Sequence, residues 1–115
     1  AARNRVRVKV DLGDDIVAQA APSKLRLIFL GLLTNGIDAL ANGGGEITVT
    51  AQNTNDRVEI DFVDGRSADA PDSFVSRAIN NVVAQVSGQI ERKQIDSGFR
   101  IRLILPPPRP LNTEG

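Results

Sequence analysis

Alternation of apolar and polar residues marks several short stretches of the chain as strands. In the first, Val6, Val8 and Val10 face one way and basic residues face the other, which is typical of a strand buried on one face only. Later stretches are joined in pairs by turn residues, so we expect two antiparallel hairpins. The five expected strands are Arg5 to Asp11, Glu46 to Gln52, Arg57 to Val63, Gln89 to Ile95 and Phe99 to Leu105.

Two other segments carry apolar residues at helical spacing. The first is expected to begin at Pro22 and to end near Asn42, before three glycines that are free to take positive φ at its end. One polar residue, Asn35, interrupts its apolar stripe. Asp72 and Ser73 are the expected caps of the second helix. The apolar positions are Leu25, Ile28, Phe29, Leu32, Leu33, Ile37 and Leu40 in the first helix, and Phe74, Val75, Ala78, Ile79, Val82, Val83 and Val86 in the second.

The order of elements is strand, helix, hairpin, helix, hairpin. Two amphipathic helices each need a surface to pack against, and a sheet with one apolar face supplies it. The predicted fold is therefore an α/β two-layer sandwich, with a five-stranded mixed sheet and both helices on one face. We expect one domain over residues 1–105 and a proline-rich tail over residues 106–115, because the run from Pro106 to Pro110 favours polyproline II.

Composition narrows the classes of function. The 115 residues contain 14 basic and 14 acidic side chains, which argues against a nucleic-acid binder. Cysteine and histidine are absent, which excludes a thiolate metal site, an imidazole base and a phosphoryl-accepting histidine within this sequence. The apolar run from Leu27 to Ile37 is shorter than the roughly 20 residues that cross a bilayer. We expect a cytoplasmic chain without membrane contact and assign no catalytic residue.

Two places carry polar residues in a setting that favours a site. Asn35 lies within an apolar helix face, and Asp64 with Gly65 follows a strand. Each also has a plain structural interpretation: an asparagine that bonds locally inside its helix, and an Asp-Gly turn. The residues alone leave both interpretations open.

The order and spacing of several stretches resemble a known family, the ATP-binding domain of sensor histidine kinases, which has the Bergerat fold shared with gyrase and related ATPases. Leu30 to Leu40, LGLLTNGIDAL, resembles the asparagine-containing helix of that family. Val6 to Asp11 resembles its first strand, and GGGEITVTAQ resembles the strand entered from the helix. Val58 to Gly65, VEIDFVDG, resembles the strand that leads into the first glycine box, and Gly98 to Pro106, GFRIRLILP, resembles the closing strand.

The resemblance implies roles for four residues. Asn35 would bind a Mg²⁺ that bridges the nucleotide phosphates, and Asp64, followed by Gly65, would accept a hydrogen bond from the adenine amino group. Asp38 matches a position at the rim of the nucleotide pocket. ATP and Mg²⁺ are accordingly the implied cofactors if the site is intact.

Three departures from the family pattern change the expected function. Gly31 stands four residues before Asn35, where a polar side chain is usual, and Arg66 stands where a second glycine is usual. The stretch from Arg66 to Pro71, before the expected second helix, contains no glycine-rich lid to hold phosphates. The chain in this respect also resembles the lid-less C-terminal domain of bacterial histidine phosphotransferases.

The predicted function is therefore a two-component phosphorelay module that docks in histidine phosphotransfer and does not hydrolyse ATP. One alternative is the ATP-binding catalytic domain of a sensor histidine kinase whose lid is not part of this sequence, and another is a plain interaction domain. The implied partners are a response-regulator receiver domain or a helical dimerisation and phosphotransfer domain. We expect this chain alone to be inactive, and to belong to a homodimer formed through a helical segment outside this sequence.

Overall fold

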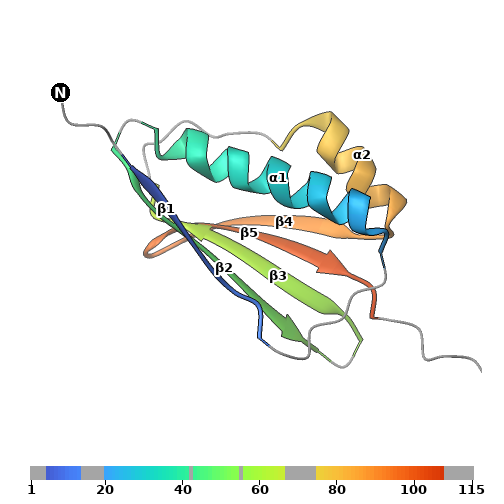
Figure 1. Cartoon of the computed structure of the whole chain (residues 1–115). Coiled ribbons are helices and arrows are strands. Elements are labelled where there is room, and N and C mark those ends of the chain that lie inside the picture. Colours follow the sequence, from blue (N-terminus) through green and yellow to red (C-terminus); the bar gives the residue numbers. More distant parts are fainter. Residues whose placement is uncertain (1–4, 14–19, 42, 55, 67–74, 108–115) are drawn as a thin grey trace, which may run out of the picture.

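The computed structural model describes residues 5–13, 20–41, 43–54, 56–66 and 75–107. The elements in these ranges are β1 (Val6–Asp11), α1 (Pro22–Ala39), β2 (Gly45–Asn53), β3 (Val58–Asp64), α2 (Arg77–Gln85), β4 (Gln89–Ile95) and β5 (Gly98–Leu105). The strands form one sheet, and both helices lie on the same side of it (Figure 1). The predicted two-layer α/β sandwich is confirmed.

The sheet has the strand order β1-β2-β3-β5-β4. β1 runs parallel to β2, whereas the other neighbouring pairs are antiparallel, so the sheet is mixed and both expected hairpins are present. One row of paired residues crosses four strands, from Val10 through Val49 and Phe62 to Ile101. Such rows make one face of the sheet apolar, which is the face that the helices cover.

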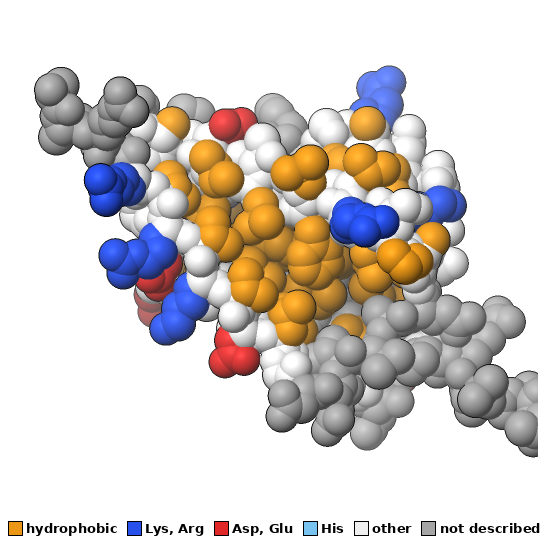
Figure 2. All heavy atoms as spheres, viewed as in Figure 1, with side chains coloured by type: hydrophobic (Ala, Val, Ile, Leu, Met, Phe, Trp, Pro, Cys, Tyr) orange, Lys and Arg blue, Asp and Glu red, His pale blue; other side chains and the backbone are white. Residues whose placement is uncertain are grey.

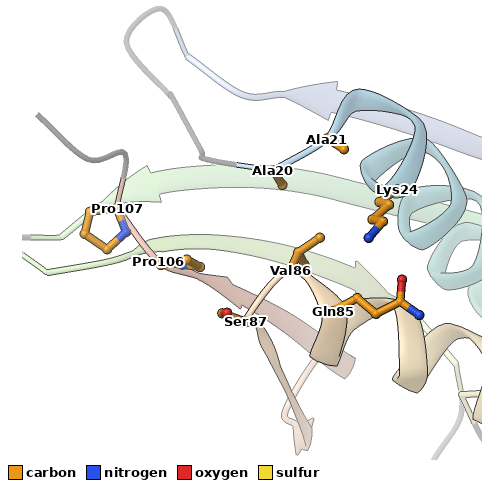
Figure 3. Close-up of a pocket in the computed structure, with 8 residues that line it drawn as sticks. All are labelled: Ala20, Ala21, Lys24, Gln85, Val86, Ser87, Pro106 and Pro107. Carbon is orange, nitrogen blue, oxygen red and sulfur yellow. The ribbon is translucent and has the colours of Figure 1, made fainter. Parts of the chain in front are cut away.

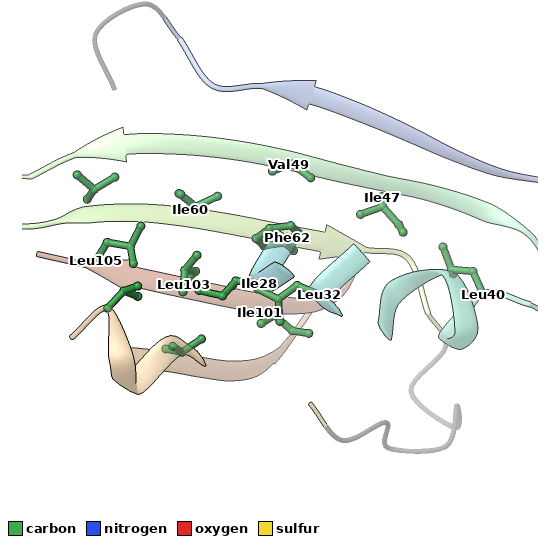
Figure 4. Packing of buried hydrophobic residues seen from close by; sticks show 13 residues of the cluster. Ile28, Leu32, Leu40, Ile47, Val49, Ile60, Phe62, Ile101, Leu103 and Leu105 are labelled. Atoms are coloured by element: carbon green, nitrogen blue, oxygen red, sulfur yellow. The ribbon is translucent and has the colours of Figure 1, made fainter. Parts of the chain in front are cut away.

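The core lies between α1 and the central strands (Figure 4). Ile28 and Leu32, one turn apart on α1, are 0% and 1% exposed and belong to the same buried cluster as Phe62 and Leu103. The ring of Phe29 meets that of Phe62 edge to face, with centroids 5.3 Å apart. The helical spacing of the apolar residues in α1 therefore fixes which side of the helix rests on the sheet.

The ends of the helices differ in part from expectation. α1 begins at Pro22 as predicted but ends at Ala39, earlier than expected; Gly44 then takes a φ of 71° and donates its N–H to the Leu40 carbonyl. α2 begins at Arg77, later than expected, because the Ser76 hydroxyl caps it by accepting the Ile79 N–H at 3.2 Å. The expected caps, Asp72 and Ser73, lie outside the described residues.

Four of the described side chains predicted to be buried are exposed, and the smallest of them is Ala78 of α2. Val8 and Val10 of β1 are 41% and 56% exposed, because β1 is an edge strand and α1 packs mainly over the strands further in. Ile37 on α1 is 41% exposed. The strict alternation in β1 is correct about which face the valines occupy, but not about what covers that face.

Neither helix described here has the length and apolarity needed to cross a bilayer. β5 ends at Leu105, and Pro106 and Pro107 follow it outside the sheet. The division into a domain and a tail over residues 106–115 stays a prediction.

Candidate functional site

The two principal residues predicted from the family resemblance come together under α1. Asn35 lies in the second half of α1, and Asp64 is the last residue of β3, which runs beneath that helix. Both are buried, with exposed fractions of 7% and 3%. Residues far apart in sequence therefore meet at one buried polar point in an otherwise apolar interface.

A third residue, Arg66, occupies the space between them. Its guanidinium binds the Asp64 carboxylate with two hydrogen bonds: Nε donates to Oδ1 at 2.8 Å and Nη2 donates to Oδ2 at 2.7 Å. Nη2 also donates to Asn35 Oδ1 at 3.1 Å, and the Arg66 backbone N–H donates to Asp64 Oδ1 at 3.1 Å. The Asp64 carboxylate, predicted to bind adenine, and Asn35 Oδ1, predicted to bind Mg²⁺, both accept hydrogen bonds from Arg66 in this structure.

The Arg66 side chain is buried as deeply as its partner. Its exposed fraction is 5%, against 4% for the Asp64 side chain. The guanidinium carbon lies 4.4 Å from the centroid of the Phe99 ring, and that of Arg92 lies 5.8 Å from the same ring. Removal of one partner from such a buried, bidentate pair leaves an uncompensated charge, which costs more than the loss of an exposed ion pair.

Two glycines allow α1 to approach its neighbours closely at this site. A Cβ atom on Gly36 would lie 2.9 Å from Ile47 Cδ1, which would have to move, and 3.5 Å from Asp64 Oδ2, which is ordinary van der Waals contact. A Cβ atom on Gly31 would lie 2.5 Å from Ile79 Cγ1. Gly31, which the sequence marks as a missing polar side chain, thus makes room for α2.

Asn35 and Asp38 also line one surface cavity of about 420 Å³ between α1 and the start of α2. This volume is within the range of small-molecule pockets. Asp38 is exposed at its rim, and Gly65 is exposed where the chain leaves β3. The remaining lining residues are Leu27, Leu30, Gly31, Thr34, Ser76 and Ile79.

A second hollow, of about 480 Å³, lies where α1 begins (Figure 3). Lys24, Gln85 and Ser87 line it together with small apolar residues. Lys24 precedes Asn35 by three helical turns, which is about 16 Å along the axis. This hollow is therefore separate from the Asn35 site.

A further polar cluster lies on the other face of the sheet, where no helix is described. Glu59 accepts a hydrogen bond from Gln52 at 2.8 Å and pairs with Arg57 at 2.7 Å. The Gln52 hydrogen bond, and then the charges of Arg102 and Arg57, lower the pKa of Glu59. The bidentate hydrogen bonds to Asp61 raise the pKa of Arg102. The Gln52–Glu59 and Asp61–Arg102 pairs bridge neighbouring strands, whereas Arg57 and Glu59 lie two residues apart in the same segment; all have a structural role.

Sequence reasoning placed Arg66 near the site but treated it only as an obstruction. Its hydrogen bonds to Asp64 and Asn35 were missed. The signal was present, since an arginine two residues after an aspartate at a strand end can fold back onto that carboxylate.

No group of three or more acidic residues that could hold a metal occurs among the described residues, and metal binding by Asn35 stays a prediction.

Comparison with known proteins identifies the fold. No protein-family model matches the chain, and no curated protein is similar to it in sequence. Among solved structures, the ATP-binding domain of PrrB from Mycobacterium tuberculosis has a TM-score of 0.72 and 21% identity, over 90% of this chain and 82% of that one. The catalytic domain of histidine kinase ThkA has a TM-score of 0.69 and 14% identity, over 90% and 78%.

ThkA has also been solved in complex with the response regulator TrrA; that kinase has a TM-score of 0.69 and 12% identity, over 90% of this chain and 34% of the kinase. At these identities the similarity establishes the architecture. The chain has the Bergerat-like fold of histidine kinase ATP-binding domains.

Proposed function

We propose that this chain is a two-component phosphorelay module that keeps the kinase ATP-binding fold, has its nucleotide site closed by Arg66, and serves docking in histidine phosphotransfer. The observation that carries the proposal is the set of hydrogen bonds from Arg66 to both Asp64 oxygens and to Asn35 Oδ1. A nucleotide that used these atoms would first have to displace a buried, bidentate guanidinium.

The size of that obstacle follows from the burial of the pair. Separating a buried ion pair so that one charge is left without its partner costs about 3–5 kcal/mol. Each 1.4 kcal/mol is a factor of ten in affinity, so displacement would weaken nucleotide binding by about two to three and a half orders of magnitude. A dissociation constant of about 1 μM would rise to between about 0.1 mM and 3 mM.

The proposed partners are a response-regulator receiver domain or a helical dimerisation and phosphotransfer domain. The complex of ThkA with TrrA supports a receiver partner for a domain of this fold. The sequence has no histidine, so in this proposal the phosphoacceptor lies on another segment or another protein. The proposed setting is the cytoplasm, with a homodimer formed through a helical segment.

A second candidate is the ATP-binding catalytic domain of a sensor histidine kinase. The solved structures similar to this chain are such domains, and they support this candidate more directly than they support docking. The cavity of about 420 Å³ that reaches Asn35 and Asp38 also favours it. In this candidate Asn35 would bind Mg²⁺, and Asp64 with Gly65 would receive the adenine once Arg66 moves away.

Calorimetric titration with Mg·ADP separates the two candidates. We expect no measurable binding to the wild-type chain and measurable binding to Arg66→Gly, which frees Asp64 and Asn35. The control, Arg66→Gly/Asp64→Asn, should lose that binding because the adenine acceptor is changed. Micromolar binding by the wild-type chain that falls in Asp64→Asn would overturn the docking proposal in favour of the kinase domain.

A further inference from the structure

The outer edge of β1 is a second surface with the properties of a binding site, and it does not depend on whether a nucleotide binds. β1 pairs with β2 on one side, in a parallel register from Val6 opposite Gly45 to Asp11 opposite Thr50. It is the end strand of the sheet, and within the described ranges no strand pairs with its other side. Its outer backbone N–H and C=O groups are therefore a template for another strand.

The helix-facing side of β1 continues the core beyond the cover of α1. Val8 and Val10 are paired with Ile47 and Val49, which are each 1% exposed, yet the two β1 valines are 41% and 56% exposed. α1 contributes half-buried apolar side chains to the same cluster, Phe29 among them. Figure 2 shows that apolar side chains gather without interruption in the middle of the face that carries α1 and β1.

The opposite side of β1 is basic. Arg5, Arg7 and Lys9 are exposed at alternate positions, and none of them takes part in an ion pair in the described structure. Their nearest acidic neighbours are Glu46, which is opposite Arg7, and Asp11, which follows Lys9 on the same face of β1. A strand laid along this edge would meet valines on one face and positive charges on the other.

We propose that the outer edge of β1 binds an extended segment of a partner protein in which apolar side chains alternate with acidic ones. The apolar residues would cover Val8 and Val10, and the acidic residues would lie opposite Arg7 and Lys9. A second copy of this chain fits less well. An antiparallel pairing of two β1 strands centred on Val8 places Arg7 opposite Lys9, where like charges repel, and Arg5 opposite Asp11, where opposite charges attract. An acidic segment would instead meet only attraction at Arg7 and Lys9.

The probe for this surface is a capped, fluorescently labelled peptide of sequence EVEVEV, titrated with the whole chain and followed by anisotropy. Lys9→Glu should weaken its binding by about fivefold, and Arg7→Glu/Lys9→Glu by about twentyfold, since each attraction becomes a repulsion. The matched control is Lys93→Glu on β4, the other edge of the sheet, which makes the same change in net charge and should leave binding unchanged.

A second peptide, N-methylated at alternate residues, keeps every charge but blocks pairing with the strand edge. It should not bind measurably. Absence of binding by the unmodified peptide overturns the proposal, as does an equal loss in Lys9→Glu and Lys93→Glu. Equal binding of both peptides to the wild-type chain overturns strand addition, because charge alone would then explain the affinity.

Discussion

Removal of the Arg66 side chain leaves a buried carboxylate without its cation. In Arg66→Ala, Asp64 loses two charge-assisted hydrogen bonds and Asn35 loses one. Breaking a buried pair in this way costs about 3–5 kcal/mol. The Arg66 backbone N–H still donates to Asp64 Oδ1 at 3.1 Å in the variant, so we expect the free energy of unfolding to fall by the lower value, about 3 kcal/mol.

Urea unfolding followed by circular dichroism measures this loss by linear extrapolation. A domain of this size has about 5–15 kcal/mol of stability, so the variant should remain folded in water. The control is Asp64→Leu/Arg66→Met, which removes both charges and should be more stable than Arg66→Ala. A loss below about 1 kcal/mol in Arg66→Ala would mean that the pair contributes no more than an exposed ion pair, contrary to its burial.

Three further predictions test the packing and electrostatics around the site. Gly31→Ala should lower the free energy of unfolding by about 1 kcal/mol, because the clash with Ile79 outweighs the gain in helix propensity. In an Ile79→Ala background the same change should raise the free energy of unfolding. Urea unfolding measures both changes. The pKa of Glu59 is lowered in the folded state, so its contribution to stability is present above about pH 4.5 and is lost as the pH falls through the folded pKa. Glu59→Gln should therefore weaken the dependence of the free energy of unfolding on pH in this range. An unchanged pH dependence would contradict this. Ser76→Ala should cost about 1 kcal/mol through loss of the α2 cap, whereas Ser97→Ala, in the turn between β4 and β5, serves as a comparison without a helix cap.

The strands and helices were predictable because their periodicities are strong. The alternation from Arg57 to Val63 and from Phe99 to Leu105 gave two central strands, each correct to within one residue at either end. The start of α2 was not predicted correctly, because Asp72, Ser73 and Ser76 all favour a cap. Within the described part of the chain, the Ser76 hydroxyl accepts the Ile79 N–H. Local sequence does not decide between neighbouring caps of similar strength.

The proximity of Asn35 and Asp64 was predictable, whereas their shared partner was not. A polar residue in an apolar helix face and an Asp-Gly after a strand drew attention to these two residues, and the family resemblance implied a common site, which stays a prediction. The pairing of Arg66 with both depends on how α1 lies over β3, which the close contact at Gly36 determines. Val8 and Val10 are exposed because the helix layer does not extend over β1, and the alternation of residues in a strand does not predict how far a helix layer extends.

We propose that Arg66 itself fills the place of a nucleotide in the wild-type chain. Nuclear magnetic resonance can test this proposal by following the Arg66 Nε–H and the Asn35 side-chain amide during titration with Mg·ATP up to millimolar concentration. We expect neither resonance to move appreciably in the wild-type chain below about 0.1 mM ligand, because displacement of Arg66 weakens binding by at least two orders of magnitude. A shift of both that saturates below this concentration, with loss of the Arg66 Nε–H signal as the guanidinium leaves Asp64, would show that Arg66 does not close the site.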